Sequence, residues 1–149
     1  MAYATVSRGF KGAQIAVPVP PSLPYVVRPE IPTDYEAGLK TTLFRNWVVD
    51  LNAFYTTIRD YQAQECTLDP ITGAPTCQPV NINGVKTRGA EASFFGHITR
   101  DLILNTGFIY AKATYPAGFI GTDGISLAGK QIAYAPRYNE TCARVGVDS

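Results

Sequence analysis

Apolar and polar side chains alternate along most of the chain, the pattern expected of β-strands whose two faces meet different surroundings. From Tyr35 to Leu43, every second residue is apolar or Thr, and the intervening positions carry Glu, Gly, Lys and Thr. The pattern predicts six strands, at residues 2–10, 33–45, 47–61, 80–95, 101–114 and 133–146. The predicted fold class is therefore all-β, an antiparallel up-and-down meander of about six long strands.

Long and short connections alternate between these predicted strands. Residues 11–32 form a long connection that carries six of the eleven prolines, and Arg45-Asn46 is a tight turn. Residues 62–79 are long again, residues 96–100 are short, and residues 116–132 are long and rich in glycine. Transmembrane β-barrels keep short turns on one side and long loops on the other, so the order predicts a partial segment of such a barrel.

Aromatic rings lie at both ends of the predicted apolar face. Trp47 is next to a short turn, whereas Tyr35, Tyr55 and Tyr110 lie eight residues further along that face from the ends of their strands. Eight residues of a strand tilted by about 40° rise roughly 20 Å, close to the apolar band of membrane barrels. Amphipathic rings favour the two membrane interfaces. We therefore expect hydrocarbon on this face. A soluble sheet packed on its own core shares the alternation and remains the alternative.

The net charge of the chain and the lengths of its apolar segments limit the classes of function that it can have. The formal net charge of +1 argues against nucleic acid as a partner, because such binders need a basic excess. No run approaches the eighteen apolar residues of a membrane helix, and no signal peptide follows Met1. Six strands are too few for a membrane barrel, whose smallest members have about eight. The pattern thus predicts a segment truncated at both ends, with a polar stretch at residues 147–149.

Six short motifs follow one another in order along nearly the whole chain. They are Ser-Arg-Gly-Phe-Lys-Gly at 7–12, Pro-Glu at 29–30 with Tyr-Glu-Ala-Gly-Leu-Lys at 35–40, Asn-Ala-Phe-Tyr and Asp-Tyr-Gln within 52–62, Asn-Ile-Asn-Gly and Gly-Ala-Glu within 81–91, Tyr-Ala-Lys-Ala-Thr-Tyr at 110–115, and Ala-Pro at 135–136. Together they resemble the C-terminal part of the β-barrel of TonB-dependent outer-membrane receptors.

The resemblance implies a role in active transport for the parent protein, in the bacterial outer membrane. Residues 1–149 would be a partial barrel domain, without the plug domain, the TonB box and the terminal strands. The implied partners are membrane lipid, the plug, the TonB energy-coupling complex and a small-molecule substrate, namely siderophore-bound iron, cobalamin or a saccharide. No cofactor and no enzymatic activity are expected. The alternatives are a segment of another barrel, such as a porin, and a secreted soluble β-sandwich that serves as a binding module.

The opposite face of the predicted strands is polar and rich in small residues. Its glycines would let another backbone approach or ease strand bending, and the resemblance implies that this neighbour is the plug. Its charged residues are expected to form structural pairs rather than to bind substrate. The residues in question are the glycines Gly38, Gly89 and Gly107 and the charged residues Glu36, Lys40, Asp50 and Glu91.

Cys66 and Cys77 lie eleven positions apart in the second long loop. An extracellular loop is oxidising, so we expect a disulfide between them. A metal site is the alternative, but the only histidine, His97, is predicted in a turn on the opposite side. That turn makes His97 a solvated residue rather than a catalytic base, because no nucleophile accompanies it. Cys142 is expected to be a small packed side chain in a strand.

Two sequence signals near turns receive structural interpretations. Asn83-Gly84 is a hairpin signal by itself, but the resemblance places it within or just before the fourth strand. Asn139-Glu140-Thr141 fits a glycosylation sequon, yet it falls in a predicted strand.

The long loops would face the substrate. They hold five residues predicted to contact it: Tyr25, Arg28, Tyr115, Phe119 and Lys130.

Overall fold

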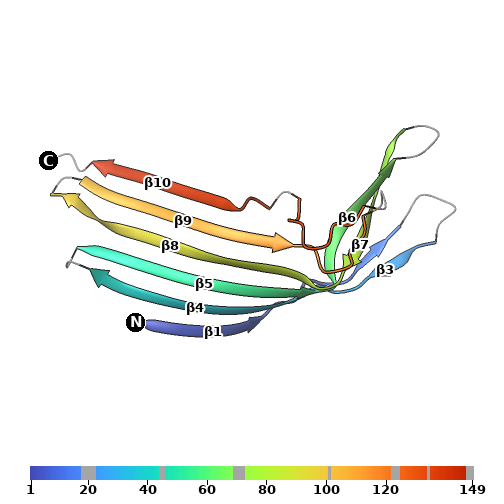
Figure 1. Cartoon of the computed structure of the whole chain (residues 1–149), viewed down its shortest axis with the longest axis horizontal. Helices are drawn as coiled ribbons and strands as arrows, with labels where there is room; N and C mark the ends of the chain where they lie inside the picture. Colours follow the sequence, from blue (N-terminus) through green and yellow to red (C-terminus); the bar gives the residue numbers. More distant parts are fainter. Residues whose placement is uncertain are drawn as a thin grey trace.

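The chain builds one large antiparallel sheet (Figure 1). The computed structural model describes residues 1–17, 23–43, 46–68, 73–100, 102–121, 125–133 and 135–146. The sheet contains β1 (Ala2–Arg8), β4 (Ile31–Leu43), β5 (Trp47–Arg59), β8 (Val85–Thr99), β9 (Leu102–Thr114) and β10 (Tyr138–Gly146), in that order. The strands pair with their neighbours in chain order and run antiparallel, so the predicted all-β meander is confirmed.

Two of the long connections contain hairpins that the sequence pattern did not predict. β2 (Gln14–Ala16) pairs with β3 (Tyr25–Val27), and β6 (Tyr61–Leu68) pairs with β7 (Pro75–Ile82). Both hairpins rise from the same end of the six-stranded sheet, on the right in Figure 1. They are short sheets of their own rather than extensions of the large one.

Turn residues set the ends of several strands. Gly84, with φ at 85°, forms a turn with Asn83 that carries the chain from β7 into β8. The predicted start of the fourth strand at residue 80 is therefore wrong, because residues 80–82 belong to β7. Asp60, with φ at 55°, turns β5 into β6; its short polar side chain is one of the few that tolerate the left-handed region.

The predicted short turn at residues 96–100 is also misplaced. β8 continues to Thr99, with a register shift between His97 and Thr99, so His97 lies in a strand and not in a turn. At the other end of the chain, β10 begins at Tyr138 rather than at residue 133. Pro136 precedes it, and proline cannot donate the backbone hydrogen bond of a ladder. Of the turn predicted at Arg45-Asn46, Asn46 is in a turn, and Arg45 lies outside the described residues.

The strand register divides the sheet into an apolar face and a polar face. Each side chain that faces the same way as Leu51 belongs to the apolar face, and each that faces the same way as Asn52 belongs to the polar face. The apolar face is not covered by a second layer of described residues: Tyr35 is 48% exposed and Leu51 is 41% exposed. A soluble sheet on its own core would bury these side chains.

The aromatic rings of the apolar face gather near its two ends. Tyr35 lies opposite Tyr55, with ring centroids 6.5 Å apart, and Tyr110 lies opposite Ala90, one pair nearer the short turns. Trp47 is at the other end of β5, opposite Gly96. Within the part of the chain that the structure describes, the sheet stays open, because β1 pairs only with β4 and β10 only with β9. Among the described residues, no helix has the length and hydropathy needed to cross a membrane.

Candidate functional site

Hydrogen bonds join the strands across the polar face. Glu36 accepts from the Tyr3 hydroxyl at 3.0 Å and from Asn52 Nδ2 at 2.8 Å. Lys40 Nζ lies 3.5 Å from Asp50 Oδ2, so these two charges form the kind of structural pair that the sequence predicts. Glu36, by contrast, is held by uncharged donors. The result is a polar surface whose side chains are positioned by their neighbours within the sheet.

Aromatic rings occupy the space above two glycines of the polar face. A Cβ at Gly38 would lie 2.4 Å from Cζ of Tyr3, and one at Gly89 would lie 2.5 Å from Cζ of Phe54. The expectation of an approaching foreign backbone is therefore corrected for both positions. The Tyr3 ring takes the space at Gly38, and the backbone carbonyl of Tyr110 and the Phe54 ring, all within this same sheet, take it at Gly89. At Gly107 nothing lies within 4 Å of such a Cβ.

Three segments form what we call the loop layer: the β2–β3 hairpin, the β6–β7 hairpin and the third loop, of which residues 115–121 and 125–133 are described. Asn81 joins the first two. Its Oδ1 accepts from the Arg28 N–H at 2.7 Å, and its Nδ2 donates to the carbonyls of Arg28 at 3.0 Å and Asp60 at 2.8 Å. The Arg28 guanidinium closes the cluster with a 2.7 Å contact to Asp60 Oδ1. Each chain segment at this junction is thus fixed by at least one other.

Gln62 reinforces the same junction. Its Nε2 donates to the carbonyl of Gly12 at 2.8 Å, and its backbone N–H donates to Glu30 Oε2 at 3.0 Å. Nearby, the Tyr25 hydroxyl donates to the Pro79 carbonyl at 2.7 Å. The polar ends of Tyr25 and Arg28, two of the predicted substrate contacts, therefore hold the first two hairpins together. Their role toward substrate remains a prediction; the Arg28 side chain keeps 65% of its surface exposed.

The third loop brings together the other three predicted contacts. The rings of Tyr115 and Phe119 stack with centroids 4.9 Å apart and planes inclined by 3°. The Lys130 carbonyl accepts from the Tyr115 N–H at 3.0 Å, and the Lys130 side chain is exposed. A hollow of about 290 Å³ separates the stacked rings from the β6–β7 hairpin, with Cys66 and Val80 on its opposite wall.

A disulfide crosses the β6–β7 hairpin. Cys66 and Cys77 face each other in the strand register, and their sulfur atoms are bonded at 2.02 Å. Cys142 lies far from them, on β10 opposite Thr106, and its side chain is exposed, so the packed position expected for it is wrong. Within the described ranges, no group of three or more His, Cys, Asp or Glu side chains is arranged to hold a metal ion.

A comparison with protein families decides the class of this sheet. The model of the family described as TonB dependent receptor-like, beta-barrel matches residues 1–139. The chain belongs to this family. The match covers all strands of the large sheet up to the first residues of β10, and it agrees with the alternating faces and the long loops at one end. No curated protein and no solved structure matches the chain.

The loop junction is the part of the site that sequence patterns missed. Asp60, Gln62 and Asn81 carry it. Asn81 is distant in the sequence from Asp60 and Gln62, and all three are distant from Arg28. Their residue types are common in loops. The motifs Asp-Tyr-Gln at residues 60–62 and Asn-Ile-Asn-Gly at residues 81–84 include all three, but only as part of the family resemblance, which did not predict that they meet.

Proposed function

We propose that the chain is a partial barrel domain of an outer-membrane receptor that imports a small-molecule substrate by TonB-dependent active transport. In the parent protein, membrane lipid would surround the apolar face and a plug domain would fill the interior beside the polar face. Siderophore-bound iron, cobalamin and saccharides are the substrate classes that this proposal covers. On this proposal the segment itself performs no enzymatic chemistry.

The difference between the two faces is the observation that carries the proposal. No charged residue lies on the apolar face between Tyr35 and Leu43, or between Trp47 and Tyr55. At the middle of a bilayer, one Lys or Arg on such a face would cost about 2–4 kcal/mol. The polar face carries Glu36, Lys40 and Asp50 at the same depth, hydrogen-bonded or paired. Such a division fits a wall between hydrocarbon and a wet or protein-filled interior.

The loop layer would form the substrate side of the receptor. Stacked rings beside a hollow of about 290 Å³ offer an apolar contact, and the exposed Lys130 offers a positive charge for an anionic substrate group. The junction of Asn81, Arg28 and Asp60 favours binding because a surface ordered in advance loses less conformational freedom when the substrate arrives.

The test is uptake by cells that carry the full receptor. Labelled ferric siderophore, cobalamin and an oligosaccharide would each be offered to cells with the receptor, without it, and without TonB. We expect uptake of one substrate to require both proteins. Uptake that needs the receptor and persists without TonB would point to a passive porin and overturn the proposal, as would uptake of all three substrates in cells that lack the receptor.

A matched pair of substitutions tests the substrate side. Phe119→Ala removes one of the stacked rings, and we expect the half-saturation concentration for uptake to rise about tenfold. Phe94→Ala is the control, since Phe94 lies on the apolar face near the short turns, opposite Val49. Equal half-saturation concentrations in the two variants would show that Phe119 does not contribute to the substrate site.

A further inference from the structure

Positive charges gather on the apolar face at the end next to the loop layer. Arg8 lies opposite Thr33 and Arg59 opposite Ile31; Lys86 is opposite Thr57. One pair nearer the middle, Arg88 lies opposite Tyr55, and Lys112 lies opposite Arg88. These five residues, which we call the cationic belt, therefore lie at or just beyond the height of the tyrosine rings.

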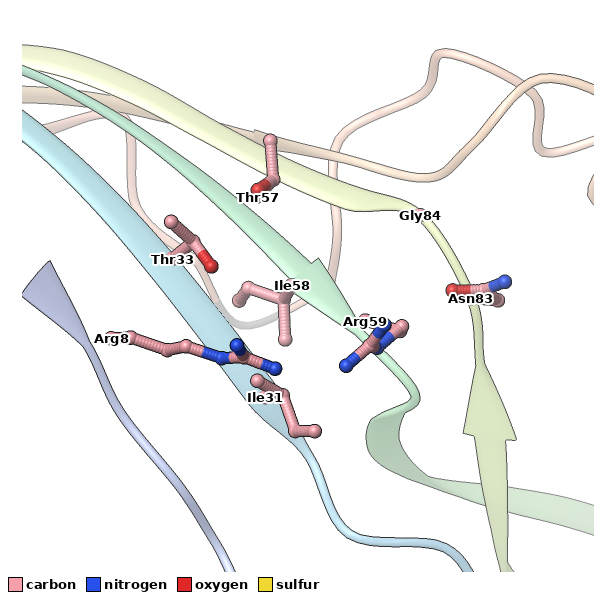
Figure 2. Close-up of a pocket in the computed structure, with 8 residues that line it drawn as sticks. All are labelled: Arg8, Ile31, Thr33, Thr57, Ile58, Arg59, Asn83 and Gly84. Atoms are coloured by element: carbon pink, nitrogen blue, oxygen red, sulfur yellow. The ribbon is translucent and has the colours of Figure 1, made fainter.

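Two arginines of the cationic belt, Arg8 and Arg59, line one hollow. Figure 2 shows Arg8 extending across β4 toward Ile31, with the Arg59 guanidinium on the other side of Ile58. The hollow measures about 390 Å³, and Thr33 and Thr57 contribute to its wall. Guanidinium groups and hydroxyls are donors that suit a phosphate, because several oxygen atoms can be bound at once.

No acidic partner neutralises the belt among the described residues. The salt bridges of the structure join Lys11 to Glu30, Arg28 to Asp60 and Lys40 to Asp50, and none includes a residue of the belt. Asp60, the nearest acid along the chain, is engaged by Arg28. Arg8, Arg59, Lys86 and Arg88 are exposed. An anion from outside the chain can therefore bind these exposed charges without competing with an acidic side chain of the described residues.

An apolar groove continues from the belt toward the middle of the sheet. Ala4, Ala37, Ala53 and Ala90 lie opposite one another on four adjacent strands, and Ala90 lies opposite Tyr110. Above this row, Val6, Tyr35 and Tyr55 help to line a hollow of about 440 Å³ that also includes Ala37 and Ala53. Small side chains between larger ones leave a shallow channel on the surface that we assign to hydrocarbon.

We propose that the cationic belt and this groove bind a phosphate-bearing lipid of the outer leaflet. The phosphate would lie in the hollow between Arg8 and Arg59, and an acyl chain would lie along the alanine row. Charge complementarity argues for the head group, and the continuity of groove and belt argues for a lipid rather than a free anion. The assignment rests on the proposed function, since it requires that the apolar face meets a membrane.

The experiment uses the full receptor in a neutral detergent and native mass spectrometry to measure lipid retention. The probes are diphosphorylated lipid A, the same lipid without phosphates, and inorganic phosphate. We expect the receptor to retain the diphosphorylated lipid in preference to the dephosphorylated one. Each cation near an anionic head group contributes about a fivefold change in binding, so Arg8→Gln with Arg59→Gln should weaken retention about 30-fold.

A single substitution and a matched control keep the result clear if the double variant fails to fold. Arg59→Gln should weaken retention about fivefold. Arg100→Gln removes the same charge at the far end of β8, next to Thr99, and should leave retention unchanged. Equal retention in the wild type and Arg59→Gln, or equal loss in both single variants, would overturn the site.

Three further outcomes separate the sources of phosphate and the two proposals. If inorganic phosphate displaces the lipid at equal concentration, the hollow binds a soluble anion and the lipid assignment fails. If substrate uptake depends on TonB, but the wild type and Arg59→Gln retain the lipid equally, only the lipid site is refuted. If the wild-type receptor does not insert into membranes at all, the proposed function fails, and the lipid site fails with it.

Discussion

The loop layer and the six-stranded sheet are stabilised in different ways. Three of the five buried apolar residues, Ala16, Val27 and Ile82, lie in the hairpins of the loop layer. The much larger sheet contributes Val49 and Val85, and Val85 is the first residue of β8, next to the β6–β7 hairpin. The loops thus contain the chain's own small core, whereas the sheet presents most of its apolar side chains to the outside.

This difference shows where each region obtains its stability. Backbone hydrogen bonds connect the strands of the sheet, but its apolar face gains free energy only when hydrocarbon covers it. The loop layer is held by contacts within the chain, namely a disulfide, the amide of Asn81 and the Arg28–Asp60 pair. A change in the surrounding medium should therefore affect the sheet first, and a change in a loop contact should stay local.

The largest expected effect comes from a charge on the apolar face. On the proposed function, Leu51→Arg would place a cation in hydrocarbon, and we expect it to lower the free energy of unfolding of the receptor in lipid vesicles by about 2–4 kcal/mol. Ser93→Arg is the control, because Ser93 lies on the polar face opposite Asp50. Urea unfolding followed by tryptophan fluorescence measures both. Equal losses would mean that the two faces meet the same medium.

Removal of the disulfide should act on the loop layer alone. Cys66→Ala with Cys77→Ala frees the β6–β7 hairpin and should destabilise it by about 3 kcal/mol, the value typical of a closed loop of this size. We expect faster protease cleavage within residues 61–82 and an unchanged unfolding midpoint of the barrel. The Cys142→Ala variant serves as the control. Free thiols at both positions in the non-reduced wild type would contradict the pairing.

A smaller effect is expected at the hydrogen-bonded junction. Asn81→Ala removes one acceptor and two donors and leaves backbone groups of Arg28 and Asp60 without these partners, at a cost of about 1–3 kcal/mol. Hydrogen exchange should accelerate in β3 and at Asp60 while β5 stays protected. Gln64→Ala, on the exposed part of the same hairpin, should change neither. Faster exchange throughout the large sheet would show that the two regions are coupled.

The sequence predicted the sheet well because its strands alternate strongly. The predicted strand at residues 47–61 and the observed β5 share their start, and they differ at the end only because Asp60 takes a left-handed turn. The hairpins were missed for a physical reason. Between Gln62 and Thr67, β6 carries polar or small side chains on both faces, so it shows no alternation. The contacts that hold it are a disulfide and hydrogen bonds to other loops, which no local pattern records.

β10 shows where the alternation fails. Its register places Glu140 on the same face as Tyr138 and Cys142, opposite Phe108. A carboxylate there departs from the charge-free pattern of β4 and β5, and the family match ends at residue 139, one residue before it.

Contacts between residues distant in the sequence, such as Asn81 with Arg28, could not be predicted either, because no periodicity records them.

The open sides of β1 and β10 have a consequence for self-association. Each leaves a row of backbone donors and acceptors without a neighbouring strand, and such rows pair readily with any extended chain. The six strands alternate in direction, so β10 of one copy can lie antiparallel to β1 of the next. This contact joins two different surfaces and can repeat from copy to copy, so the isolated chain should assemble into closed rings or sheet-like polymers rather than stay a single copy.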